Sequence, residues 1–295
     1  MAKSKVYFTK ELTSDGLIKI YEAMGRDLQS KVAVKISTGE PGGHNFLQPK
    51  LIKGLVNKLS GTIVECCTAY RGKRFDAAHH WQAIKDHGFT DIAPCDIMDE
   101  EGEVKIPVTG GKHLKGYNLV GTHISNYKSM LMLSHFKGHA MGGFGGALKN
   151  MSIGVASRNG KAWIHSVGRT EDPDAMWGMT EDQDGFLESM AEACLSVVTY
   201  YGAENMAYIN VANRLSIDCD CDSNPHEPEM ADIGIFASLD PVALDKCCYD
   251  TIMNSDDKGK ASLVNRMLKK HAIHLVDTAE KLGLGSEEYE LVNID

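Results

Sequence analysis

The chain has 295 residues, of which 43% are hydrophobic and 24% are charged. This balance is typical of a folded globular protein and excludes a disordered or fibrous chain. The formal net charge of -9 excludes a broad nucleic-acid-binding surface, so we expect no nucleic-acid partner.

The first predicted elements alternate between β-rich runs and amphipathic stretches. Strands are expected at 32–37 and 62–68, and helices follow them at 49–59 and 77–87. This βαβα order predicts an α/β fold with a mostly parallel sheet and helices on both faces. Further strands are expected at 91–97, 104–108, 117–124 and 130–135, the last being almost continuously apolar, as in a buried strand.

The second half of the chain continues this alternation. A helix is expected at 184–201 and strands at 207–211 and 233–238. Asp240-Pro241 then predicts a helix start, with an N-cap and a proline at the first helical position, and a last helix covers 262–282. We expect one α/β domain over 1–295; the alternative is two lobes, about 1–167 and 184–295, joined by the loop 168–183.

No segment contains the roughly 18 consecutive apolar residues that span a bilayer, and no apolar signal core follows the first residues. We therefore expect a cytoplasmic protein with no membrane partner. The eight cysteines include no Cys-x-x-Cys pair. In such a chain they are expected to be thiols or ligands and not a disulfide framework.

The densest group of reactive side chains lies between Ser134 and Asn150, directly after the apolar strand. Glycine allows backbone to approach a ligand closely, and open α/β sheets bind ligands where a strand ends in such a loop. We therefore place an active site here; the alternative is a flexible basic loop. The segment supplies His135, His139 and Lys149 as candidate catalytic residues, with Lys149, Gly143, Gly145 and Gly146 as candidate cofactor contacts.

Two features downstream suit a metal ion. His165 follows Trp163-Ile164 on an expected short strand, and imidazole is the commonest protein ligand for transition metals. Cys219 and Cys221 lie among three aspartates, and soft thiolates suit zinc, iron or copper. We predict metal ligands among His139, His165, Cys219 and Cys221. Alternatively, His165 is an ordinary core histidine and the cysteines are buried in a turn capped by aspartates.

Loops after two earlier strands add polar groups. Glu40 lies in the segment 38–44 and Arg71 in the segment 70–74, where a cation would contact an anionic substrate. We predict both residues as cofactor or substrate contacts, with solvated turns as the alternative.

Six segments of the chain form a recognisable set: Thr38-Gly-Glu40, 70–74, 134–139, 143–150, Cys219-x-Cys221-Asp222 and 232–245. Together they resemble the family called domain of unknown function 362, whose members are often labelled iron-sulfur centre proteins. The resemblance covers nearly the whole chain. Many members carry a ferredoxin-like insertion with eight cysteines, whereas residues 168–185 here contain none.

The order of His139, Lys149 and His165 is similar, more distantly, to that in the N-terminal domain of nickel-pincer lactate racemases. There, a histidine, a glycine-rich loop, a lysine that carries a covalent nickel cofactor and a nickel-ligating histidine follow one another. This resemblance implies a racemase-like N-domain fold, with His139 as acid-base group, Lys149 as cofactor anchor and His165 as metal ligand. The racemases' second catalytic histidine has no counterpart near Tyr70, so two-base racemisation is not implied.

Together these patterns predict a metal- or cofactor-dependent enzyme, an oxidoreductase or isomerase, that acts on a small anionic metabolite. The expected cofactor is a nickel, zinc or iron ion, or a covalent or iron-sulfur group. One alternative is a metal-binding or electron-transfer accessory protein that uses Cys219 and Cys221; another is a binding module for an anionic metabolite. The 14 methionines fit either a homo-oligomer interface or core filling.

Overall fold

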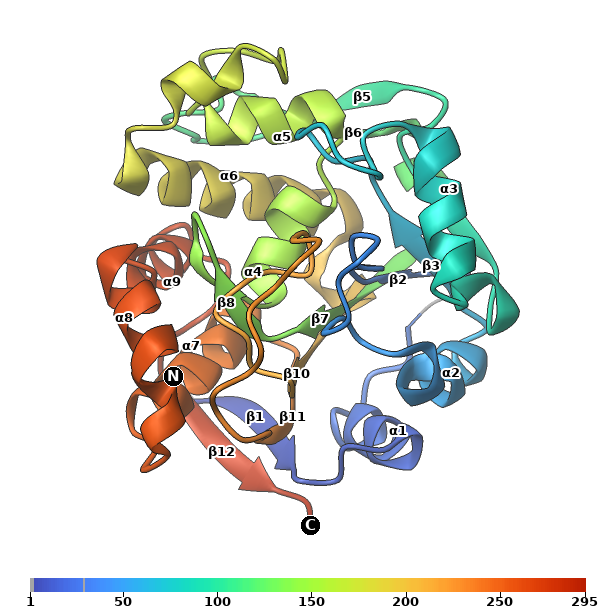
Figure 1. Ribbon diagram of the computed structural model, residues 1–295, viewed down its shortest axis with the longest axis vertical. Helices are drawn as coiled ribbons and strands as arrows, with labels where there is room; N and C mark the ends of the chain where they lie inside the picture. Colours follow the sequence, from blue (N-terminus) through green and yellow to red (C-terminus); the bar gives the residue numbers. More distant parts are fainter. Residues whose placement is uncertain (1–2, 29) are drawn as a thin grey trace.

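The computed structural model describes residues 3–28 and 30–295. Its centre is an eight-stranded sheet in the order β12-β1-β11-β10-β7-β2-β3-β4 (Figure 1). Neighbouring strands run parallel except for β11, which pairs antiparallel with β1 and β10. The predicted α/β class with a mostly parallel sheet is confirmed. The strands are β1 Ser4–Thr9, β2 Val32–Lys35, β3 Thr62–Glu65, β4 Cys95–Ile97, β7 Ser129–His135, β10 Met206–Ala212, β11 Gly234–Ser238 and β12 Tyr289–Asn293.

Helices cover both faces of the sheet, as Figure 1 shows. On one face, α1 (Ser14–Ala23), α2 (Pro49–Lys58) and α3 (Ala77–Asp86) bury apolar side chains against β2, β3 and β7. A second apolar cluster, on the other face, includes side chains from α4 (Ala147–Lys149) to α9. The remaining helices are α5 Arg158–His165, α6 Gln183–Tyr201, α7 Pro241–Met253, α8 Ala261–Lys269 and α9 Ile273–Lys281.

Two small antiparallel ladders lie outside the main sheet. One pairs β5 (Glu103–Pro107) with β6 (Tyr117–Gly121). The other pairs β8 (Lys137–His139) with β9 (Gly143–Gly145), so the glycine-rich segment after β7 folds as a hairpin and not as an open loop. A π-helical turn, Asn150–Gly154, follows α4.

Local signals set several boundaries. Asp240 caps α7 by accepting from the backbone N–H groups of Val242 and Ala243, with Pro241 at the first helical position, as its sequence predicts. The expected last helix is wrong as a single element. It divides into α8 and α9 because His271 adopts a left-handed backbone conformation with φ +50°.

The expected strand around His165 is also wrong. Ser157 caps a helix by accepting from the N–H of Gly160, and this helix, α5, ends at His165. A short apolar run such as Trp163-Ile164 fits a helix as well as a strand, so its pattern alone does not decide. Cys66 and Cys67, expected on a strand, follow the last residue of β3.

One apolar cluster draws on both sides of the loop 168–183, for example Trp163 and Phe186. Division of the chain into two lobes at this loop stays a prediction. Within residues 3–28 and 30–295, no helix combines the length and apolarity that a bilayer-spanning helix needs.

Candidate active site

The parallel strands β2, β3 and β7 have their carboxyl ends on the same side of the sheet. Segments that follow these strands line a cavity of about 310 Å3. We call it the strand-end cavity. A neighbouring pocket of about 340 Å3 shares Tyr70, Ala140 and Cys221 with it and also contacts Glu40, Arg71 and Cys219. The reactive side chains that line the strand-end cavity are Lys35, Glu65, Cys66, Tyr70, Arg74, His139, Lys149, Asn150, Lys161, His165 and Cys221.

The β8–β9 hairpin brings His139 to this cavity. The N–H of Gly138 donates to the carbonyl of Ser216 at 2.8 Å, and a Cβ at Gly138 would lie 2.1 Å from the carbonyl oxygen of Ile217. Glycine is therefore required here, because any side chain would push the hairpin away from the segment that leads to Cys219. Gly138 thus sets the distance between the hairpin and the cysteine segment.

Asp220 fixes the turn between the two cysteines. Its carboxylate accepts from His135 Nδ1 at 2.8 Å and pairs with Lys137 Nζ at 2.9 Å. Burial alone would raise the pKa of Asp220, but His135 and Lys137 hold it below its ordinary value. The ring of His135 also contacts the carbonyl of Asn213 through Nε2, at 2.6 Å. His135 therefore holds the turn and is absent from the lining of the strand-end cavity.

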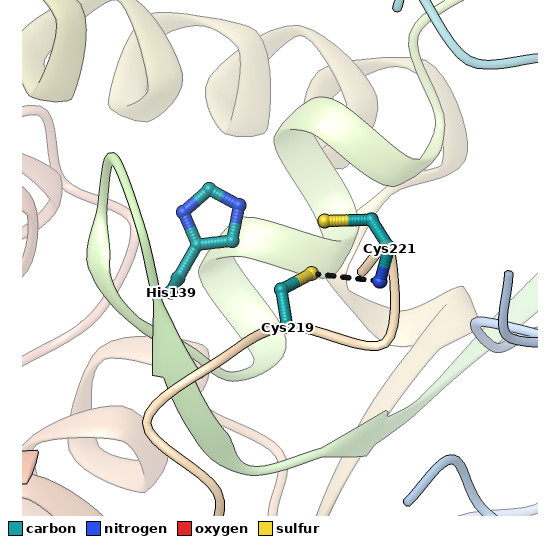
Figure 2. A group of neighbouring side chains, drawn as sticks. All are labelled: His139, Cys219 and Cys221. Atoms are coloured by element: carbon teal, nitrogen blue, oxygen red, sulfur yellow. Dashed lines mark hydrogen bonds between the residues drawn. The ribbon is translucent and has the colours of Figure 1, made fainter. Parts of the chain in front are cut away.

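Cys219, Cys221 and His139 converge, as Figure 2 shows. One ligand atom of each lies within 4.8 Å of the others. The backbone N–H of Cys221 donates to Cys219 Sγ at 3.3 Å, and Lys149 Nζ lies 3.9 Å from the same sulfur. A hydrogen bond from the side chain of Cys221, followed by the charge of Lys149 and a hydrogen bond from His139, lowers the pKa of Cys219 well below the usual thiol value. The pKa of Cys221 is raised, first by that same hydrogen bond. Cys219 is the thiolate of the pair.

His139 and His165 present opposite tautomers. His139 Nδ1 accepts from the backbone N–H groups of Gly142 at 2.8 Å and Met141 at 3.3 Å, so the neutral ring carries its proton on Nε2. His165 Nδ1 instead contacts the carbonyl of Lys161 at 2.7 Å, which places the proton on Nδ1 and leaves Nε2 with a lone pair. Burial lowers the pKa of His139, and it lowers that of His165 to about 4. Both rings are neutral at pH 7.

The cavity is positively charged. Lys35 pairs with Glu65 at 2.8 Å, and Arg74 pairs with Glu65 at 3.2 Å and with Glu40 at 3.0 Å. Lys161 is buried, and its Nζ donates to the carbonyl of Ala156. Among the described residues, neither Lys161 nor Lys149 makes an ion pair with a carboxylate. The cavity wall therefore holds cations that no protein carboxylate neutralises.

The other predicted contacts lie apart from this cavity. Glu40 accepts from Tyr70 and Arg74 at one end of the wall. Arg71 extends outward and pairs with Asp174, and 70% of its side chain is exposed. Gly143 packs against Ala272, where a Cβ would approach to 2.5 Å.

Gly145 and Gly146 lie beside a small adjoining pocket that Lys149 also lines. A Cβ at Gly146 would lie 2.5 Å from Asp245 Oδ1, whose carboxylate accepts from the first N–H groups of α4. The glycines thus pack the segment that positions Lys149.

Sequence reasoning missed Lys35, Glu65 and Lys161, and within the segment 70–74 it singled out Arg71 and not Arg74. Arg74 lies three residues after the predicted Arg71. The two differ in exposure, because Arg74 is buried and Arg71 is exposed. Lys35 and Glu65 are charged residues at the ends of otherwise apolar strands. A charge in that place is costly to bury without a partner, and this is the signal that could have identified the pair.

Fold and site together define an α/β protein with a basic, thiol-containing cavity at the carboxyl ends of parallel strands. The family described as Domain of unknown function (DUF362) matches residues 32–250. The chain therefore belongs to the DUF362 family, which confirms that resemblance.

Solved structures give low-identity matches. The lactate racemase apoprotein from Thermoanaerobacterium thermosaccharolyticum is 13% identical, with a TM-score of 0.45 over 83% of this chain and 56% of that chain. A protein from Thermotoga maritima is 11% identical, with a TM-score of 0.45 over 81% of this chain and 58% of that chain. The chain thus spans a little over half the length of these two structures. No curated protein matches it.

Proposed function

We propose that this chain is a metal- or cofactor-dependent enzyme that acts on a small anionic metabolite in the strand-end cavity. The observation that carries the proposal is the convergence of Cys219, Cys221 and His139 within 4.8 Å, next to Lys149 and Lys161, which make no ion pair with a carboxylate among the described residues. Thiolates and imidazole are the donors that zinc, nickel and iron prefer.

The charge of the wall supports an anionic substrate. Lys161 and Lys149 both line the cavity, and neither has a carboxylate partner among the described residues. A buried cation is costly unless a negative group approaches it, and a carboxylate or phosphate would supply that charge. Arg74 is already held by Glu40 and Glu65, so its role is to keep the wall in place.

The number of thiols supports a mononuclear metal over an iron-sulfur cluster. Cubane and two-iron clusters commonly use four cysteine ligands. In the described part of the chain, the group that could bind a metal here contains two cysteines, Cys219 and Cys221. A metal held by them leaves coordination positions for an imidazole and for substrate.

The two tautomers support different roles for the histidines. Metal-bound imidazoles usually donate their other N–H to a carbonyl or carboxylate, which is the state of His165. His139 has backbone N–H donors at Nδ1, so a metal at its Nε2 would have to displace the ring proton toward them. We assign His139 as the group that donates or accepts a proton beside Cys219, and His165 as the nitrogen ligand. His165 lies outside the group that converges within 4.8 Å, so side chains must move to bring its Nε2 to the two sulfurs.

The roles of the two histidines can be separated by metal affinity. Full-length His165→Ala should lose at least about tenfold in affinity for Zn²⁺, since even partners outside the ligand set contribute 10- to 100-fold. His139→Ala should keep most of the affinity but lose activity once a substrate is identified. The reverse order of affinities would contradict this assignment.

The anion can be tested by thermal shift with inorganic phosphate and a panel of small carboxylates. At least one anion should raise the Tm, and Lys161→Gln and Lys149→Gln should each remove the rise. Lys112→Gln, which changes an exposed lysine, is the matched control and should keep it. A wild-type protein that responds to none of these anions would contradict the proposed substrate class.

The identity of the cofactor can be tested by elemental analysis and intact mass of the native protein. The proposal predicts one metal ion bound to the cysteine pair, and an organic cofactor joined to Lys149 would add mass that Lys149→Ala removes. A binding module would bind the anion with neither metal nor added mass.

A further inference from the structure

A second group of histidines and carboxylates lies where α6 begins and α9 packs against it. His271 Nδ1 contacts Asp184 Oδ1 at 2.7 Å, and His274 Nε2 contacts Glu188 Oε1 at 3.0 Å. His113 Nε2 reaches the other oxygen of Glu188 at 2.5 Å. We call these five residues the α6–α9 cluster. It is separate from the strand-end cavity and lines neither of the two pockets described above.

Helix geometry brings these donors together. Asp184 and Glu188 are four residues apart in α6 and therefore share one face of that helix. His271 and His274 are three residues apart across the turn that starts α9, and their rings stack with centroids 5.0 Å apart. One donor atom each from Asp184, His271 and His274 lies within 4.8 Å of the others. Two imidazoles and one carboxylate thus converge, and Glu188 lies beside them in contact with His274.

The charges of the cluster are not balanced when the imidazoles are neutral. Two imidazoles contact the carboxylate of Glu188: His113 Nε2 lies 2.5 Å from Oε2, and His274 Nε2 lies 3.0 Å from Oε1. Within the described chain, the ammonium that reaches it is Lys112, at 3.2 Å, on a side chain that is 76% exposed. Protonating both stacked rings would place two like charges face to face. A divalent cation between rings and carboxylates would balance the site without that repulsion.

We propose that the α6–α9 cluster binds a zinc-type divalent cation through Asp184, His271 and His274, with Glu188 as the fourth ligand. Two imidazoles and two carboxylates are a ligand set that Zn²⁺ accepts in a tetrahedral arrangement. Zinc–ligand distances are about 2.0 to 2.2 Å, so rotation of these partly exposed side chains must bring their donors closer. His113 would then hydrogen-bond to Glu188 without binding the metal, since carboxylates that bind a metal are commonly hydrogen-bonded by a further residue.

The cation would fix the turn that supports the catalytic hairpin. Gln183 Nε2 donates to the carbonyls of Met141 and Lys270, each at 2.9 Å, which joins the β8–β9 hairpin to the α8–α9 turn. Gly143 packs against Ala272 in that same turn. A metal that holds His271 and His274 to α6 would therefore stabilise the α8–α9 turn, against which the β8–β9 hairpin with His139 packs. The site does not depend on the proposed chemistry in the cavity.

The test uses full-length protein with Cys219→Ser and Cys221→Ser, so that zinc at the thiols does not contribute. Titration with Zn²⁺ by calorimetry should give one site per chain and a zinc-dependent rise in Tm. Adding His274→Ala should weaken binding at least about tenfold and abolish the rise. Asp184→Asn, which keeps the size of the side chain, should do the same.

The matched control is His79→Ala, which removes an exposed histidine that pairs with Asp76 in another part of the surface. It should leave zinc affinity and the Tm rise unchanged. The absence of a zinc site in the thiol-free protein, or equal affinity with and without His274→Ala and Asp184→Asn, would overturn the proposal. This titration does not test the metal site at Cys219 and Cys221. If that site binds no metal, the failure would be seen in the wild-type chain and not in the Cys219→Ser, Cys221→Ser variant.

Discussion

Lys149 Nζ lies 3.9 Å from the sulfur of Cys219, so the amine at the end of α4 is the neighbour of the thiol whose pKa is lowered. The backbone N–H of Cys221 reaches the same sulfur at 3.3 Å. Thiolates at such positions are the reactive form of cysteine. This relationship gives a prediction that needs no knowledge of the substrate.

The pH dependence of alkylation of Cys219 should shift when Lys149 is neutralised. In metal-free protein, Lys149→Gln should move the midpoint of the rate-against-pH curve upward by about one pH unit or more, because the thiolate loses an adjacent positive charge. Iodoacetamide labelling followed by peptide mass spectrometry measures the rate at this residue. Lys161→Gln is the control lysine, and an equal shift in both variants would refute the specific role of Lys149.

Loss of the Asp220 charge should destabilise the whole cysteine turn. Asp220→Asn leaves His135 and Lys137 without their buried anion, and breaking such a pair costs about 3 to 5 kcal/mol of unfolding free energy. Denaturant unfolding measures it. Asp222→Asn changes an exposed neighbour in the same turn and should cost less than about 0.5 kcal/mol. Equal effects of the two substitutions would show that the buried contacts of Asp220 carry no stability.

A methyl group at Gly138 should separate the hairpin from the cysteine segment. The Cβ of Gly138→Ala would lie 2.1 Å from a backbone oxygen of Ile217, and overpacking of this kind costs about 1 to 3 kcal/mol. Metal affinity should fall with stability, because the clash with Ile217 displaces the segment that carries Cys219. Gly178→Ala, at a position where a Cβ meets nothing within 4 Å, is the control. A Gly138→Ala protein with wild-type stability and metal affinity would be inconsistent with this packing.

His80 should make the protein less stable in acid. Its ring is buried in α3 with neither nitrogen hydrogen-bonded, and burial lowers its pKa to about 3. The unfolded chain takes up a proton near pH 6.5 that the folded chain refuses until near pH 3, so stability falls as the pH drops between these values. His80→Leu should reduce the loss of unfolding free energy between pH 7.5 and pH 5 by about 2 kcal/mol.

Denaturant unfolding at the two pH values measures this difference. His79→Leu changes the exposed neighbour and should keep the wild-type pH dependence. If His80→Leu loses as much stability on acidification as the wild-type protein, the ring is protonated or hydrated inside the fold.

The sequence was sufficient for the central strands β2, β3, β7, β10 and β11 and for α2, α3, α6 and α7, because apolar period and capping residues act locally. It did not indicate α1 or β12. Asp240-Pro241 predicts the start of α7 correctly. The break at His271 and the helix that ends at His165 depend on tertiary packing, and the apolar pattern of the sequence does not predict that packing. The same limit explains why the sequence indicated Arg71 rather than Arg74.

The candidate site was partly visible in the sequence. Glycines and a histidine after an apolar strand indicated an active-site loop. The segment folds as a hairpin instead, and this hairpin brings His139 beside Cys219 and Cys221. The role of His135 was not visible, because its partner Asp220 is 85 residues away in the chain. The α6–α9 cluster was missed for a similar reason, since its histidines and carboxylates come from distant helices.

The central claim is that Cys219 and Cys221 together bind a metal ion at the strand-end cavity. Its most direct measurement is the absorption spectrum of the metal-free protein titrated with Co²⁺, because sulfur bound to cobalt gives an intense charge-transfer band that nitrogen and oxygen ligands lack. The account predicts this band in the wild-type chain and its loss in Cys219→Ser and in Cys221→Ser, with Cys194→Ser unchanged. A wild-type spectrum without a sulfur-to-cobalt band, or one that survives both substitutions, would contradict the account.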